Sequence, residues 1–234
     1  MKPVFPGFSA EALEFLRKLK RNNRRPWFLR NKETYDREVK GPMIELVKSL
    51  NEELRSCGSE FVTEPRRAIY RIYRDIRFSS DKSPYKTHIA ALFAPQGFAK
   101  HACAGLYFHF SPQELLIAGG VYMPGPKELL AIRGYVAEHE KGLRRILNGK
   151  VFRRSFGEME GSQLSRVPKG FSPTHPAADL LRFKQYLVVA KYSVTLLTTA
   201  ALLPTLSESF KLLLPFLRFL NAPLQPRKPD VIEL

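Results

Sequence analysis

The chain has 234 residues, 44% of them hydrophobic and 26% charged, and this composition excludes a predominantly disordered protein. Lysine and arginine total 38 against 22 acidic residues, so the formal net charge is +16 and the chain should attract polyanions. Its two cysteines stand outside any CxxC pair or Cys/His cluster, which excludes a disulfide framework and gives no metal-binding motif.

Residues 1–60 have the pattern of a helical segment. Ser9 is placed to cap a first helix, because an apolar stripe with helical spacing follows it. Pro26 suits the first turn of a second helix, which we expect Gly41 and Pro42 to interrupt. A third helix is predicted over residues 43–54.

After Pro65 the periodicity changes to that of short strands. Four segments are rich in branched and aromatic residues and are separated by Pro, Gly or Ser. Within residues 65–125 they predict a mostly antiparallel meander, with strands in segments 67–75, 87–94, 104–111 and 115–123.

Residues 126–234 combine helices with a late strand. A helix is predicted from Pro126, with a shorter one after it, and a fifth strand over residues 186–194. The closing helix is expected to start near Ser207, as its possible cap. The fold class is therefore α+β, with a mostly antiparallel sheet of about five strands packed with N-terminal, middle and C-terminal helices.

No repeat period and no long linker divides the chain, so residues 1–234 are predicted to form a single α+β domain. The most apolar stretch, residues 194–206, is too short to span a membrane. The first eighteen residues lack the apolar core of a signal peptide. We therefore expect a cytoplasmic protein with no membrane contact.

Residues 71–88, RIYRDIRFSSDKSPYKTH, hold an unusual density of charge. In an extended strand the side chains at 71, 73, 75 and 77 share one face, which is too polar for an ordinary core. Tyr107 and His109 share a face of another predicted strand, and Lys191 belongs to the late strand. If these strands are neighbours, they form a cationic and aromatic pocket. Alternatively, the charges pair across strands on a solvent-facing side of the sheet.

The charged stretch also carries a resemblance. Its spacing RxxRDxRFxxxDKxxY is formed by Arg71, Arg74, Asp75, Arg77, Phe78, Asp81, Lys82 and Tyr85. With FPGF at 5–8, NNRRPWF at 22–28, GGVYMP at 119–124 and VPKGF at 167–171, the chain resembles the DUF2461 family of bacterial and fungal proteins. That family has no established activity, so the resemblance implies no catalytic residue.

The chemistry of the motif indicates anion binding. Arg74, Arg77 and Lys82 suit phosphate or carboxylate, while Asp75 and Asp81 would orient these cations or act on a substrate proton. An aspartate among arginines should have a lowered pKa, which suits an orienting role or a metal ligand better than a general acid. The predicted ligand-binding residues are Arg71, Arg74, Asp75, Arg77, Asp81, Lys82, Tyr85, Tyr107 and Lys169.

No catalytic residue is assigned, and Asp75 and His109 are the candidates for proton transfer. His88, His109 and His175 lack metal-ligand spacing, so no metal site is predicted. No pattern identifies a cofactor or an oligomeric state.

Three functions follow from these residues. The first is a basic pocket on a sheet face for a phosphorylated small molecule or a nucleic-acid backbone, with or without enzyme activity. The alternative is a non-catalytic nucleic-acid-binding module that uses dispersed positive charge. In that case Trp27 and Phe28 are either base-stacking residues or, as more commonly in proteins, part of the core. In the third, the motif is a structural polar network and the function depends on a protein partner.

Overall fold

The structure, a computed structural model, describes residues 4–98 and 101–224. It is α+β, and its strands form one antiparallel sheet in the order β1–β2–β3–β4. The strands are β1 (Ile89–Phe93), β2 (Gly105–Phe110), β3 (Leu115–Val121) and β4 (Tyr186–Tyr192). The helices are α1 (Ala10–Arg21), α2 (Arg25–Arg30), α3 (Lys32–Thr34), α4 (Gly41–Cys57), α5 (Pro65–Ala68), α6 (Pro126–Glu138), α7 (Glu140–Leu147), α8 (Lys150–Phe156), α9 (Ala178–Leu181) and α10 (Leu202–Asn221). A π-helical turn, η1 (Tyr35–Lys40), and two 3-10 helices, η2 (Ser59–Phe61) and η3 (Val194–Thr198), complete the elements.

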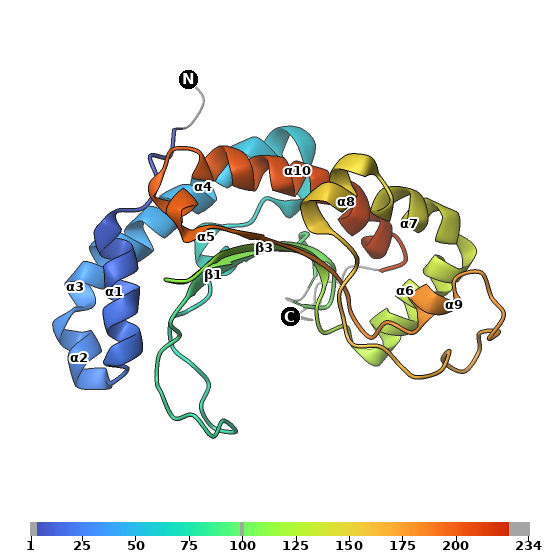
Figure 1. The fold of residues 1–234 in the computed structure, drawn as a ribbon, viewed down its shortest axis with the longest axis horizontal. Coiled ribbons are helices and arrows are strands. Elements are labelled where there is room, and N and C mark those ends of the chain that lie inside the picture. The colour runs from blue at the N-terminus through green and yellow to red at the C-terminus, as the bar shows by residue number, and fades with distance from the viewer. Residues whose placement is uncertain (1–3, 99–100, 225–234) are drawn as a thin grey trace, which may run out of the picture.

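The molecule has the shape of an arch (Figure 1). Helices α4 and α10 lie over one face of the sheet, α1–α3 form one leg and α6–α9 form the other. The core lies between the sheet and the upper helices, because alternate strand residues such as Phe93, Phe108 and Ile117 point that way and are fully buried. The opposite face of the sheet lies on the underside of the arch.

Close packing of α10 on the sheet depends on a glycine in β3. A Cβ atom at Gly119 would lie 2.8 Å from a methyl group of Leu213 in α10. A larger residue at this position would force the Leu213 side chain to move, so the glycine makes room for it. The glycines of the GGVYMP segment therefore have a packing role.

The N-terminal helices are formed largely as predicted. The Ser9 hydroxyl accepts a hydrogen bond of 3.1 Å from the backbone N–H of Ala12, so Ser9 caps α1. The expected interruption at Gly41 and Pro42 is wrong, because helical turns continue from α3 through η1 into α4. The wider π turn, in which the Gly41 N–H bonds to the carbonyl of Asp36, accommodates a proline that cannot donate to the preceding turn.

The predicted strand at 67–75 is also wrong, which leaves four strands in residues 4–98 and 101–224 where about five were expected. Its first residues belong to α5, and the rest makes only isolated bridges, Ile69 to Ala91 and Tyr73 to Tyr85. The Arg74 N–H donates to the carbonyl of Pro84, but proline has no N–H to return a bond. The ladder therefore cannot continue, and the segment forms an irregular hairpin.

The last helix begins five residues earlier than predicted. Ser207 is not its cap but lies inside α10, 5% exposed, and its hydroxyl donates a 3.1 Å bond to the Glu53 carboxylate in α4. Leu202, Leu203 and Leu206 extend the helix because they are buried in the core. None of the helices in residues 4–98 and 101–224 is long and apolar enough to cross a membrane.

Candidate functional site

The underside of the sheet is hollowed into a pocket of about 420 Å³. Small residues make this space. In the register of the sheet, Ala90 of β1 lies opposite His109, and Ala118 of β3 lies opposite Tyr107. The apolar floor includes Ala90, Leu92, Leu116, Ala118, Leu187 and Val189, and the polar lining residues are Tyr70, Lys86, His88, His101, Tyr107, His109 and Tyr122.

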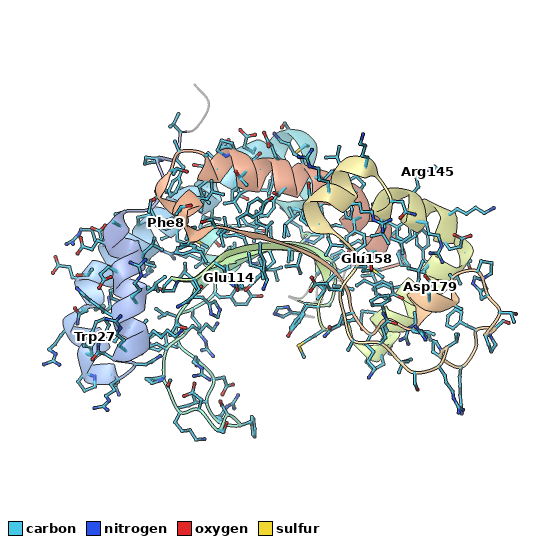
Figure 2. The ribbon with its side chains drawn as sticks, in the orientation of Figure 1. Phe8, Trp27, Glu114, Arg145, Glu158 and Asp179 are labelled. Atoms are coloured by element: carbon cyan, nitrogen blue, oxygen red, sulfur yellow. The ribbon has the colours of Figure 1, made fainter. Side chains whose placement is uncertain are left out.

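A chain of polar side chains runs along one side of the pocket. The Tyr107 hydroxyl lies 3.1 Å from Nδ1 of His109, whose Nε2 lies 3.7 Å from the Glu114 carboxylate. Lys191 pairs with the same carboxylate at 3.4 Å. Figure 2 labels Glu114 below the sheet, on the side away from α10. This arrangement holds the imidazole between a hydroxyl and a carboxylate.

Burial lowers the pKa of His109, although the Glu114 charge acts in the opposite direction. Burial also raises the pKa of Tyr107 well above its usual range, so that its hydroxyl keeps its proton. A protonated Tyr107 can donate to Nδ1, which leaves the His109 proton on Nε2, facing Glu114.

His88 packs beside His109, with 5.2 Å between ring centroids. Burial, together with the nearby charges of His109 and Lys86, lowers the pKa of His88 to about 4. Both imidazoles are thus neutral at neutral pH. Each can then accept one hydrogen bond from a ligand or a neighbour and donate another.

Lys86 is the cation of the pocket wall. Its Nζ lies 5.1 Å from the centroid of the Tyr70 ring, and the hydroxyl of Tyr70 lies 3.2 Å from Nε2 of His101. Burial lowers the pKa of Lys86, and the nearby Arg71 charge lowers it further. Within the described part of the chain, the pocket lining has no carboxylate and Lys86 has no ion pair.

The motif residues lie apart from this lining. Arg74 forms an ion pair with Asp81, and Arg77 pairs with Asp75 at 2.7 Å. Lys82 donates a 3.1 Å bond to the carbonyl of Ile76. These contacts close the loop of the hairpin between α5 and β1, which Figure 1 shows extending away from the sheet.

The carboxylates of this loop have lowered pKa values, as expected among arginines. Hydrogen bonds from Arg77 lower the pKa of Asp75 to about 2. Hydrogen bonds from Ser83 and then from Arg74 hold the pKa of Asp81 below its ordinary value. Both carboxylates are therefore ionised at neutral pH and suit orientation of cations better than donation of a proton.

Three further predicted ligand residues have different surroundings. Tyr85 is 3% exposed, and its ring stacks on that of buried Phe28 with 4.1 Å between centroids. Arg71 is exposed and acts electrostatically on Lys86. Lys169 is exposed in the loop between α8 and α9 and does not line the pocket. Of the predicted set, Tyr107 lines it, as does the proton-transfer candidate His109.

Sequence reasoning missed the roles of Tyr70, Lys86, His88 and His101. The signal for two of them was present, since Lys86 and His88 continue the period-two pattern of Ala90 at the start of β1. His101 has no such signal because it lies in a turn, with a positive φ of 70°. Among the described residues, no group of three or more His, Cys, Asp or Glu side chains could hold a metal ion.

Comparison with known proteins identifies a family. A family model described as "Conserved hypothetical protein (DUF2461)" matches residues 11–219, and the chain therefore belongs to the DUF2461 family. No curated protein and no solved structure matches the chain. The family description specifies no substrate or reaction.

Proposed function

We propose that this DUF2461 protein binds a small organic anion, a phosphorylated or carboxylated molecule with a flat apolar body, in the pocket under the sheet. The observation that carries the proposal is Lys86, a half-buried ammonium group without a carboxylate partner among the described residues. Positive charge that the fold leaves uncompensated favours an anionic ligand.

The rest of the lining supports the ligand class. A volume of about 420 Å³ falls within the range of small-molecule sites, which are mostly apolar with a few placed polar groups. The floor around Ala90 and Ala118 would receive the flat body between aromatic walls. Neutral His88 and His109 would provide hydrogen bonds without adding charge.

The proposal moves the centre of anion binding from the motif loop to the pocket wall. Arg71 would add positive charge near Lys86, because its guanidinium is close enough to lower the pKa of that lysine. Direct ligand contacts by Arg74, Arg77, Lys82 and Lys169 stay a prediction. Arg74 and Arg77 already pair with carboxylates, and Lys82 bonds to a backbone carbonyl. Lys169 does not line the pocket. The pocket around Lys86 is therefore better supported than the motif loop as the anion-binding site.

Phenyl phosphate, which joins an anion to a flat body, is a suitable probe. We expect ligand-observed NMR to detect its binding, with weaker binding of inorganic phosphate and of phenol separately. Lys86→Gln should reduce the affinity for phenyl phosphate by about tenfold, since a charge-assisted contact is lost. Lys184→Gln is the matched control, because Lys184 is exposed and does not line the pocket.

Two results would overturn the proposal. One is the absence of phenyl phosphate binding at millimolar concentration. The other is an equal effect of Lys86→Gln and Lys184→Gln, which would mean that the probe responds to net charge and not to the pocket.

A further inference from the structure

Positive charge is gathered at the free end of the α1–α3 leg. In the thirteen residues 18–30 there are six cations and no acidic residue: Lys18, Lys20, Arg21, Arg24, Arg25 and Arg30. We call these six residues the cationic tip. All are exposed, and none forms an ion pair with another described residue. The excess charge of the chain is therefore concentrated here and not only dispersed.

Helix stability does not account for all of the tip. Lys18, Lys20 and Arg21 lie in the last turn of α1, where positive charge is favourable. Arg24 and Arg25 instead occupy the N-cap and first position of α2, where the helix dipole disfavours it, and no side chain caps that end. Arg24 and Arg25 therefore lie where the helix dipole is unfavourable to positive charge. This placement suggests that a negatively charged partner binds there.

Exposed aromatic rings lie on the hairpin that packs against the α1–α3 leg. We call residues 73–85, the loop end of the hairpin, the finger. Phe78 is 95% exposed on the finger and Tyr73 is 50% exposed at its base. The ring of Tyr73 lies 6.3 Å from that of Phe28 in α2, and the Arg25 charge reaches the hydroxyl of Tyr85. In Figure 1 the finger extends alongside the α1–α3 leg.

We propose that the cationic tip and the finger bind single-stranded nucleic acid, with backbone phosphates on the tip and a base stacked on Phe78. Unpaired lysines and arginines attract a phosphate backbone, and exposed rings stack on bases of any sequence. A single strand presents its base faces, whereas a duplex hides them in the stack. The proposal does not depend on the ligand of the pocket under the sheet.

The charge component can be tested with a fluorescein-labelled oligouridine of about 12 nucleotides, a length suited to a single-strand site. The tip variant combines Lys20→Gln, Arg21→Gln, Arg24→Gln and Arg25→Gln. The control variant removes the same charge from α7 and α8 by Lys141→Gln, Arg145→Gln, Lys150→Gln and Arg154→Gln, all exposed and without ion pairs among the described residues. Figure 2 shows Arg145 on the leg opposite to Trp27.

Fluorescence anisotropy at several KCl concentrations is the measurement. We expect the tip variant to lose at least about tenfold in affinity at low salt, and its slope of log K against log[KCl] to be shallower by about 3. The control variant should keep most of the wild-type affinity and slope. Equal losses in the two variants would overturn the proposal in favour of dispersed charge.

The stacking component is tested by Phe78→Ala, which should lower the affinity about tenfold without changing the salt slope. Leu130→Ala is the control, since Leu130 is 61% exposed on α6. Neither truncation should alter folding, which circular dichroism checks, because both side chains are largely in solvent. An unchanged affinity in Phe78→Ala would refute base stacking. Equal binding of a duplex, or equal competition by inorganic polyphosphate, would refute single-strand recognition.

Discussion

Asn23 and Tyr85 exchange two hydrogen bonds, although 62 residues separate them. The Asn23 side chain donates to the Tyr85 carbonyl at 2.8 Å and accepts from the Tyr85 N–H at 3.0 Å. Asn23 belongs to the NNRRPWF segment and Tyr85 ends the charged motif. The two segments are therefore parts of one contact, which fixes the hairpin to the α1–α3 leg.

Asn23→Ala should lower the free energy of unfolding by about 2 kcal/mol, because two part-buried hydrogen bonds are lost and two backbone groups lose their partner. Urea denaturation measures the change. Asn22→Ala is the control, since Asn22 is exposed and, among the described residues, its side chain bonds to the Lys18 carbonyl of its own helix. Equal effects of the two changes would show that the contact with Tyr85 adds no stability.

Gly120→Ala should destabilise the fold by at least about 3 kcal/mol, since overpacking and a disfavoured φ act together. A Cβ atom there would lie 1.9 Å from the Tyr186 carbonyl oxygen of the neighbouring strand, and the φ of Gly120 is +133°. A Cβ atom at Gly134 in α6 would meet open space. Gly134→Ala should therefore stabilise the fold by about 0.5–1 kcal/mol. Thermal unfolding compares the two. A tolerated alanine at 120 would contradict the close strand contact.

His88 should make stability depend on pH. Its pKa falls from 6.5 in the unfolded chain to about 4 in the fold, so the unfolded state binds more protons between these values. The contribution of His88 to the free energy of unfolding is thus complete above pH 6.5 and declines as pH falls toward 4. The full pKa shift of His88 corresponds to about 3 kcal/mol of unfolding free energy. Because the side chain is partly exposed to solvent, we expect roughly 2 kcal/mol.

His88→Gln isolates that contribution from the other titrating groups. The difference in unfolding free energy between wild type and variant should shrink by roughly 2 kcal/mol as the solution is acidified across this window. Urea denaturation at matched pH values gives the difference. A difference that stays constant with pH would mean that His88 is not held neutral by burial.

Anion binding should weaken as pH rises, if Lys86 provides the charge. Its pKa is lowered from 10.5, so it begins to lose its proton at a lower pH than an exposed lysine. A phosphate monoester keeps constant charge from about pH 7.5 to about pH 10, so the change in phenyl phosphate affinity reports on the protein. NMR titration of wild type should show the fall and Lys86→Gln should show a flatter profile. Parallel profiles would exclude Lys86 as the source.

The ion pair between Arg74 and Asp81 is predicted to order the finger and to add little global stability. Asp81 is 59% exposed, so solvent screens the pair. Arg74→Gln with Asp81→Asn should leave the melting temperature nearly unchanged while speeding proteolytic cleavage within the finger. Lys32→Gln with Asp36→Asn neutralises another exposed pair and serves as control. A large loss of melting temperature would instead favour a structural polar network.

Much of the local structure was predictable because its signals lie close together in the chain. Ser9 and the apolar stripe behind it specify a capped helix within a few turns. The alternation in β2 likewise places Tyr107 and His109 on one face and Phe108 and Phe110 on the other. These signals need no knowledge of a partner segment.

Elements whose structure depends on a distant segment of the same chain were predicted less well. Residues 69–74 have strand-like composition, but Pro84 on the opposite arm prevents a continuous ladder. Ser207 has the chemistry of a cap, but burial of Leu202 and Leu203 extends α10 in front of it. In both cases a contact distant in sequence overrides a local preference.

The sequence by itself determined the α+β class, the Ser9 cap of α1, the two faces of β2 and the large positive charge. Only the tertiary structure decided which charges remain without a partner, because pairing depends on distances that folding sets. It placed Asp75 and Asp81 on the arginines of their own loop and left Lys86 and the cationic tip without a carboxylate among the described residues. Two of the four cations of the motif are therefore paired with its own carboxylates, while Lys86 and the cationic tip stay available to a ligand.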